Sequence, residues 1–109
     1  MLDQKIIYYE GYKIQRIGYK EYNNGSKGSI GNSDWGKIIK YNVIKENKLT
    51  NFEFRIGFKH IIARFNSSES EQELFLKAEN KIRECINSGE IQNKKQFNFE
   101  FDGDTFSPV

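Results

Sequence analysis

Two residues of the chain could together form a nucleophile and its base: Cys85, the only cysteine, and His60, the only histidine. A thiol activated by a neighbouring imidazole is a common arrangement in nucleophilic catalysis. Cys85, however, falls at an apolar position of a predicted helix, where a cysteine commonly serves as a small core residue. A single cysteine also excludes an internal disulfide and a cysteine-based zinc site within one chain. We therefore expect a protein that is not an enzyme and needs no metal or cofactor, with a His60–Cys85 pair as the catalytic alternative.

Three other stretches resemble binding motifs but lack the residues that complete them. The glycines at every third position of residues 25–31 are not followed by the Gly-Lys-Ser/Thr of a phosphate-binding loop. Asp102-Gly103-Asp104 resembles the start of a calcium loop without the rest of its ligand pattern, so we expect a plain turn. The glutamates within residues 69–73 lie at a predicted helix start, where their charge complements the helix dipole.

The clearest chemical feature is the uneven distribution of charge along the chain. Residues 1–65 hold 12 lysines and arginines against 6 acidic residues, whereas residues 66–109 hold 5 against 9. Aromatic residues are interleaved with the cations of the first half, and such a surface can dock on a protein, or can stack bases and follow a phosphate backbone. The residues that we expect to form this binding surface are Tyr12, Arg16, Tyr19, Lys20, Tyr22, Trp35 and Lys37.

We expect these residues to recognise another protein through a basic aromatic sheet face and a glycine-rich loop, with single-strand or duplex nucleic acid as the alternative target. A purely structural interpretation stays open, because tyrosine and tryptophan favour strands and an outer face rich in lysine keeps a sheet soluble. The opposite charges of the two halves also permit self-association into a homo-oligomer.

The amino-acid composition indicates the kind of organism from which the protein comes. Isoleucine (14 residues) exceeds leucine (4), and lysine (13) exceeds arginine (4), which are biases that A/T-rich codons produce. We therefore expect an origin in a low-GC bacterium, or in a phage or plasmid of one, where small accessory and inhibitor proteins have this length. The chain shows neither a run of about 18 apolar residues nor a basic-then-apolar leader, so we expect a cytoplasmic protein without membrane contact.

The elements that must position these residues are predicted from hydrophobic spacing and turn residues. Glu10-Gly11 separates two extended segments and predicts a hairpin, because glycine tolerates the positive φ of a tight turn. Alternation of apolar and polar residues predicts further strands, and it loosens at residues 60–65, which suggests a bulge or a covered strand end. The predicted strands are residues 6–9, 12–17, 37–44, 52–58 and 97–101, with a long glycine-rich loop at 23–36.

A helix over about residues 69–87 is predicted by a capping sequence at Ser68, a stripe of apolar residues and a stop at Gly89. The opposite side of this helix is rich in charge. We expect an ion pair there between Glu79 and Arg83, which are four residues apart in the favourable order.

These elements predict a single compact domain over residues 1–109 of the α+β class. Its antiparallel sheet has four to five strands with the amphipathic helix on one face, in the order ββββαβ, and Pro108 is expected to keep the C-terminus irregular. The element order over residues 12–87 is similar to the sheet-plus-helix modules with which some phage integrases and single-strand-binding proteins grip DNA. That similarity implies the nucleic-acid alternative.

Overall fold

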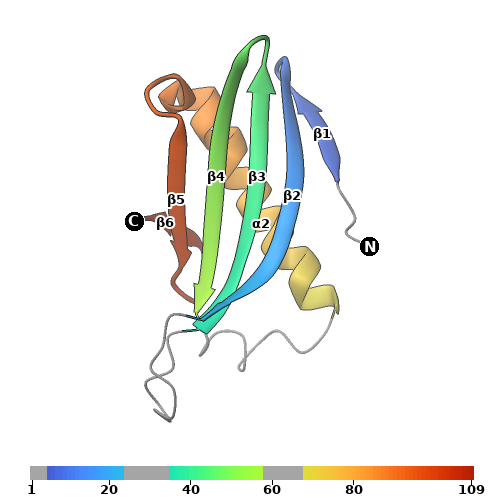
Figure 1. The fold of residues 1–109 in the computed structure, drawn as a ribbon, viewed down its shortest axis with the longest axis vertical. Coiled ribbons are helices and arrows are strands. Elements are labelled where there is room, and N and C mark those ends of the chain that lie inside the picture. The colour runs from blue at the N-terminus through green and yellow to red at the C-terminus, as the bar shows by residue number, and fades with distance from the viewer. Residues whose placement is uncertain (1–4, 24–34, 58–67) are drawn as a thin grey trace.

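The computed structural model describes residues 5–23, 35–57 and 68–109 of the chain. They form an α+β fold in which one helix, α2 (Ser68–Ser88), lies across one face of a six-stranded sheet (Figure 1). The strands follow one another in space in chain order: β1 (Ile6–Tyr9), β2 (Tyr12–Asn23), β3 (Trp35–Lys45), β4 (Lys48–Gly57), β5 (Gln96–Phe101) and β6 (Phe106–Pro108). The predicted class and element order are confirmed, but the sheet has six strands where four or five were expected.

The sheet is antiparallel except at one place. β1 to β4 form an antiparallel meander, whereas β5 pairs parallel to β4. A parallel neighbour needs a long crossover connection, and α2 is the main element of that crossover. A one-turn 3₁₀ helix, η1 (Glu90–Gln92), then leads from α2 towards β5. The helix must therefore run along the sheet, and it covers the face on which it packs.

The β1–β2 hairpin turns at Glu10 and Gly11, both of which have positive φ, of 50° and 82°. The hairpin expected from the glycine is thus confirmed. β2 is longer than predicted, since its pairing with β3 continues to Asn23 opposite Trp35. The glycine-rich loop expected at 23–36 is therefore shorter at both ends, and the rest of it lies outside the described residues, as does the irregularity expected at 60–65.

The chain after β5 departs from the prediction. Pro108, expected to leave the terminus irregular, lies in β6 opposite Phe99, at the edge of the sheet. Proline lacks an N–H group, and an edge strand tolerates this because only one side of the strand has a neighbour. The turn expected at Asp102-Gly103-Asp104 is confirmed, because Asp102 Oδ1 accepts hydrogen bonds from the backbone N–H groups of Asp104 and Thr105. These bonds, that from Thr105 first, lower the pKa of the Asp102 carboxyl.

The core lies between the sheet and α2, and its centre is a set of phenylalanine rings. The parallel register places Phe52 beside Phe97 and Phe54 beside Phe99, with ring centroids 4.7 Å and 5.1 Å apart. The strand alternation that predicted these positions is therefore confirmed. The stripe on α2 that covers them consists of Leu74, Phe75, Ala78, Ile82 and Cys85, all of them buried. Gly89 has a φ of 85° and ends the helix as expected.

Replacing Phe54 with alanine should strongly destabilise the fold. The side chain is fully buried and its ring contacts Phe99 and Phe106, so the substitution leaves a cavity and costs about 3 to 5 kcal/mol. Urea unfolding followed by circular dichroism measures this change. Leu76→Ala is the matched control, because Leu76 is 54% exposed on α2 and its loss should change stability by no more than about 0.5 kcal/mol.

Candidate functional site

Four of the seven residues expected at the binding surface lie on the face of the sheet that α2 covers. The guanidinium of Arg16 sits 3.8 Å above the centre of the Phe75 ring, and the Tyr19 ring meets the same ring edge-on at 5.2 Å. Lys37 Nζ lies 3.8 Å from a carboxylate oxygen of Glu71 on α2. Tyr12 is half-buried against the core. Arg16, Tyr19 and Lys37 thus contact the helix, which is a structural role that the sequence interpretation did not assign to them.

Burial changes the acidity of Tyr19 in this position. Its pKa is raised above the ordinary range, first by burial and then by the negative charge of Glu71. The Lys37 ammonium lies 4.9 Å from the centre of the same ring, between the tyrosine and the helix carboxylate. Tyr19, Lys37 and Glu71 therefore form one partly buried polar group at the start of α2.

A bulge in β2 decides which residues face the helix. The pairing register between β2 and β3 shifts between Arg16 and Gly18, so Ile17 is an extra residue in β2. Before the shift, Tyr12, Ile14 and Arg16 share the helix-covered face; after it, Tyr19 takes that face and Lys20 points the other way. Strict alternation would have placed Arg16 and Lys20 together, and the bulge separates them.

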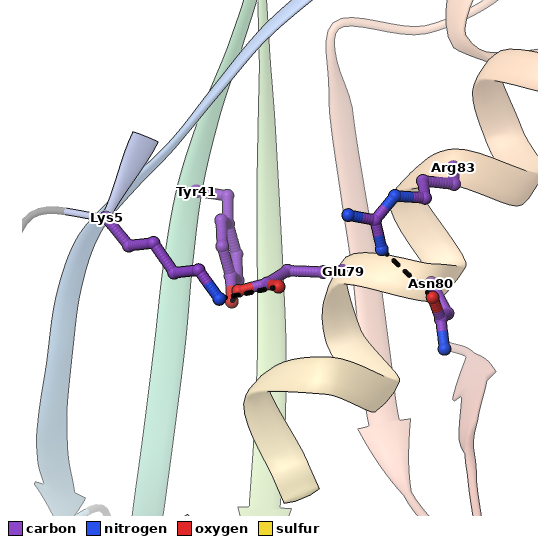
Figure 2. A network of polar contacts seen from close by, with 5 residues as sticks. All are labelled: Lys5, Tyr41, Glu79, Asn80 and Arg83. Carbon is purple, nitrogen blue, oxygen red and sulfur yellow. Dashed lines mark hydrogen bonds and ion pairs between the residues drawn. The ribbon is translucent and has the colours of Figure 1, made fainter. Parts of the chain in front are cut away.

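A fully buried polar contact joins α2 to the sheet through Glu79 (Figure 2). Its side chain is fully buried, and its two carboxylate oxygens accept hydrogen bonds from the Tyr41 hydroxyl at 2.9 Å and from Lys5 Nζ at 3.4 Å. Burial, followed by the charge of Glu79, raises the pKa of Tyr41 above its ordinary range. A buried carboxylate is tolerated because both of its oxygens have a partner.

The ion pair expected between Glu79 and Arg83 is not formed. Glu79 falls on the apolar stripe of α2 and its carboxylate accepts from Tyr41 and Lys5, whereas the Arg83 guanidinium donates to Asn80 at 3.0 Å (Figure 2). The same guanidinium lies 5.6 Å from the centre of the Tyr9 ring. The signal that could have revealed this is a single acidic residue within the helical spacing of the apolar stripe. A carboxylate at such a position needs a donor from the facing sheet, and Tyr41 supplies it.

The opposite face of the sheet, which we call the outer face, is covered by no element that the structure describes. Side chains on this face alternate along each strand with those that face α2, and Lys40 and Glu53 form an ion pair across it at 3.9 Å. Three large apolar residues are exposed here, namely Ile6 (43%), Tyr8 (75%) and Leu49 (46%). Among the described residues, the cations on this face are Lys13, Lys20, Lys40 and Arg55, and the acidic residues are Glu53 and Glu100.

Of the seven predicted residues, Lys20 lies on the outer face and is exposed. Tyr22 and Trp35 lie in the end regions of β2 and β3, paired with Gly36 and Asn23 respectively. The structure therefore does not gather the seven residues on one surface. The sequence interpretation missed Tyr8, whose position in a short edge strand before the first turn gave no indication of its exposure.

Cys85 belongs to the core stripe of α2, and burial is the first cause that raises its pKa, from 9.0 to about 11. A thiol with so high a pKa is neutral at physiological pH and is a poor nucleophile. This environment favours the packing role of Cys85 over the catalytic alternative. His60, the proposed partner, lies outside the described residues.

We found no match to the chain among models of known protein families, among curated proteins or among solved structures. Within the described parts of the chain, no helix is both long and apolar enough to cross a membrane.

A double-mutant cycle on Tyr41 and Glu79 should reveal strong coupling. Tyr41→Phe removes the donor and Glu79→Ala leaves the Tyr41 hydroxyl buried without its acceptor, so the two changes together should cost less than their sum by about 1 to 3 kcal/mol. Urea unfolding of the four proteins gives this value. Lys5→Met serves as the comparison, because half-exposed Lys5 should contribute no more than about 1 kcal/mol. A coupling energy near zero would contradict the assigned hydrogen bond.

The thiol of Cys85 should be protected in the folded protein. Since its folded pKa of about 11 exceeds its unfolded value, the neutral thiol contributes to stability below pH 9 and this contribution is lost as the pH rises from 9 to about 11. At pH 8 a chromogenic disulfide reagent should react with native Cys85 far more slowly than with the chain unfolded in urea. Equal rates in the two states would show that the thiol is accessible.

Proposed function

We propose that the protein is a small non-enzymatic binding protein that docks on another protein through the outer face of its sheet. The observation that carries this proposal is the exposure of Ile6, Tyr8 and Leu49 on a sheet face that no described element covers. Scattered apolar residues are ordinary on protein surfaces, but here they share one face of a single sheet. Tyrosine is also among the residues that contribute most at protein interfaces.

Charge indicates the chemistry of the partner. The outer face has more cations than carboxylates, and neither Lys13 nor Lys20 has an ion pair with a carboxylate in the part of the chain that is described. A partner surface with carboxylates around an apolar centre would complement this face, and such complementarity speeds association and selects against basic partners. The bacterial, phage or plasmid origin, and a role as an accessory or inhibitor protein, are supported only by composition and length.

The contacts of the tyrosine rings within the fold favour a protein target over nucleic acid. Single-stranded nucleic acid is commonly held by aromatic rings on which bases stack. Tyr19 packs against Phe75, and the Tyr12 ring has the Lys45 ammonium 4.9 Å from its centre, so both rings already have neighbours. On the outer face Tyr8 is the one aromatic residue among those with described side chains, which provides little stacking surface.

Site-specific photo-crosslinking tests the proposal. A photoreactive phenylalanine analogue replaces Tyr8 on the outer face, or Leu76 on the exposed side of α2 as the matched control. In lysate of a low-GC bacterium that produces the chain, the Tyr8 position should give a protein adduct of defined mass that survives nuclease treatment, and the Leu76 position should not. An adduct that disappears with nuclease would favour the nucleic-acid alternative.

Reversing one charge on the outer face turns the same experiment into a quantitative test. Lys20→Glu places a carboxylate on the outer face and should lower the yield of the Tyr8 adduct by at least about tenfold, since like charges across an interface cost several kcal/mol. Lys81→Glu on α2 is the control and should leave the yield unchanged, because Lys81 pairs with Glu84 away from this face. Equal adducts from both crosslinking positions, or no effect of Lys20→Glu, would contradict docking through the outer face.

A further inference from the structure

Two adjoining clefts lie at the end of the sheet where the β3–β4 hairpin meets the connection from α2 to β5. Their volumes are about 400 Å³ and 610 Å³, and they share Asn47, Lys48, Thr50, Ile91 and Gln92 as lining residues. Four lysines line them: Lys45 and Lys48 from the hairpin, and Lys94 and Lys95 from the connection. We call this region the lysine cleft. Each of the two volumes falls within the range of about 300 to 1,000 Å³ that small-molecule sites occupy.

The backbone fixes both walls of the lysine cleft. Lys45 and Lys48 stand directly opposite each other in the register of β3 and β4, on either side of the turn at Glu46 and Asn47. The connection forms the other wall and is tied to β4 by a hydrogen bond of 2.8 Å from the Asn51 backbone N–H to the Lys95 carbonyl. The buried residues Thr50 and Ile91 lie between the two walls. The lysine side chains therefore extend from a backbone framework that is already in place.

The cleft lysines differ from four other described lysines, which have acidic partners. Lys5, Lys37, Lys40 and Lys81 each have a carboxylate oxygen within 4 Å. None of the four cleft lysines has such an ion pair with any described residue; Lys45 and Lys94 each lie 4.9 Å from an aromatic ring centre instead. Glu46 is the one acidic residue among the described residues that line the clefts. Like charges placed opposite each other in a sheet are destabilising, and a bound anion would offset that cost.

The donor set indicates which anion. Lysine binds phosphate as a point charge, whereas planar carboxylates are best recognised by the paired N–H groups of arginine, and no arginine is among the described lining residues. Amide side chains of Asn47, Asn51, Gln92 and Asn93 add neutral donors around the lysines. We propose that the lysine cleft binds a ligand that carries two or more phosphate groups. This site is independent of the proposed protein-binding face and borders it at Leu49 and Asn51, which belong to both.

Calorimetric titration at low salt tests this proposal with three probes: inorganic tripolyphosphate, ATP, and a single-stranded oligonucleotide of about 12 nucleotides. At least one probe should bind with a saturable isotherm. Lys48→Ala and Lys95→Ala should each weaken that binding by about tenfold, and Glu46→Gln should strengthen it several-fold, because it removes the acidic residue of the cleft. The lysines concerned are on the surface, so circular dichroism should show an unchanged fold.

The probes separate the two sources of phosphate. Binding of tripolyphosphate and ATP without the oligonucleotide identifies a free phosphorylated compound, whereas binding of the oligonucleotide with a steep dependence on salt identifies a nucleic-acid backbone. Lys13→Ala and Lys20→Ala on the outer face are the controls and should leave affinity within about twofold. The proposal is overturned by the absence of saturable binding at about 1 mM of every probe, or by cleft variants that behave like these controls.

Discussion

The packing of phenylalanine rings between β4 and β5 is the interaction on which the other features of the structure depend. The register of β4 and β5 places Phe52 and Phe54 beside Phe97 and Phe99. Because these two strands run parallel, a crossover must carry the chain back along the sheet, and α2 is its main element. The helix then lies on the face that holds the rings and buries them. One helix covers one face, so the other face of the sheet has no cover among the described elements, and this is where docking is proposed.

A second constraint comes from the polar side of the contact between α2 and the sheet. Glu79 is fully buried, and it fixes the helix relative to β3 because the Tyr41 hydroxyl is a directional donor. Arg16 and Lys37 extend the same contact through the Phe75 ring and the Glu71 carboxylate. A cation that serves in this way cannot also face a partner, since the helix occupies the space in front of it. Basic residues of β2 and β3 thus have different surroundings according to the face on which they lie.

The sequence predicts features that depend on neighbouring residues, and it does not predict features that depend on contacts between distant segments. Local spacing predicts the helix from Ser68 with nearly correct bounds, since periodicity is read from neighbouring residues. It also predicts the strand at Phe52, although β4 begins earlier, at Lys48. The parallel pairing of β5 depends on contacts between distant segments and leaves no local pattern. The candidate site was harder still, because one extra residue at Ile17 moves every later side chain of β2 to the other face. Only the glycine at position 18 hints at that bulge.

Charge pairing within the fold explains where unpaired positive charge remains. The basic first part of the chain and the acidic second part meet where α2 packs on the sheet, and there Lys5 and Lys37 find carboxylates of Glu79 and Glu71. Other lysines lie away from these two carboxylates, although Lys40 on the outer face pairs with Glu53. Some of them lie on the outer face and in the lysine cleft, where Lys20 and Lys48 have no ion pair with a described residue. The formal net charge is only +2, yet the described residues form two separate cationic surfaces. Their surroundings differ, with exposed apolar side chains in one and neutral amides in the other, and this difference is the reason why different partners are proposed for them.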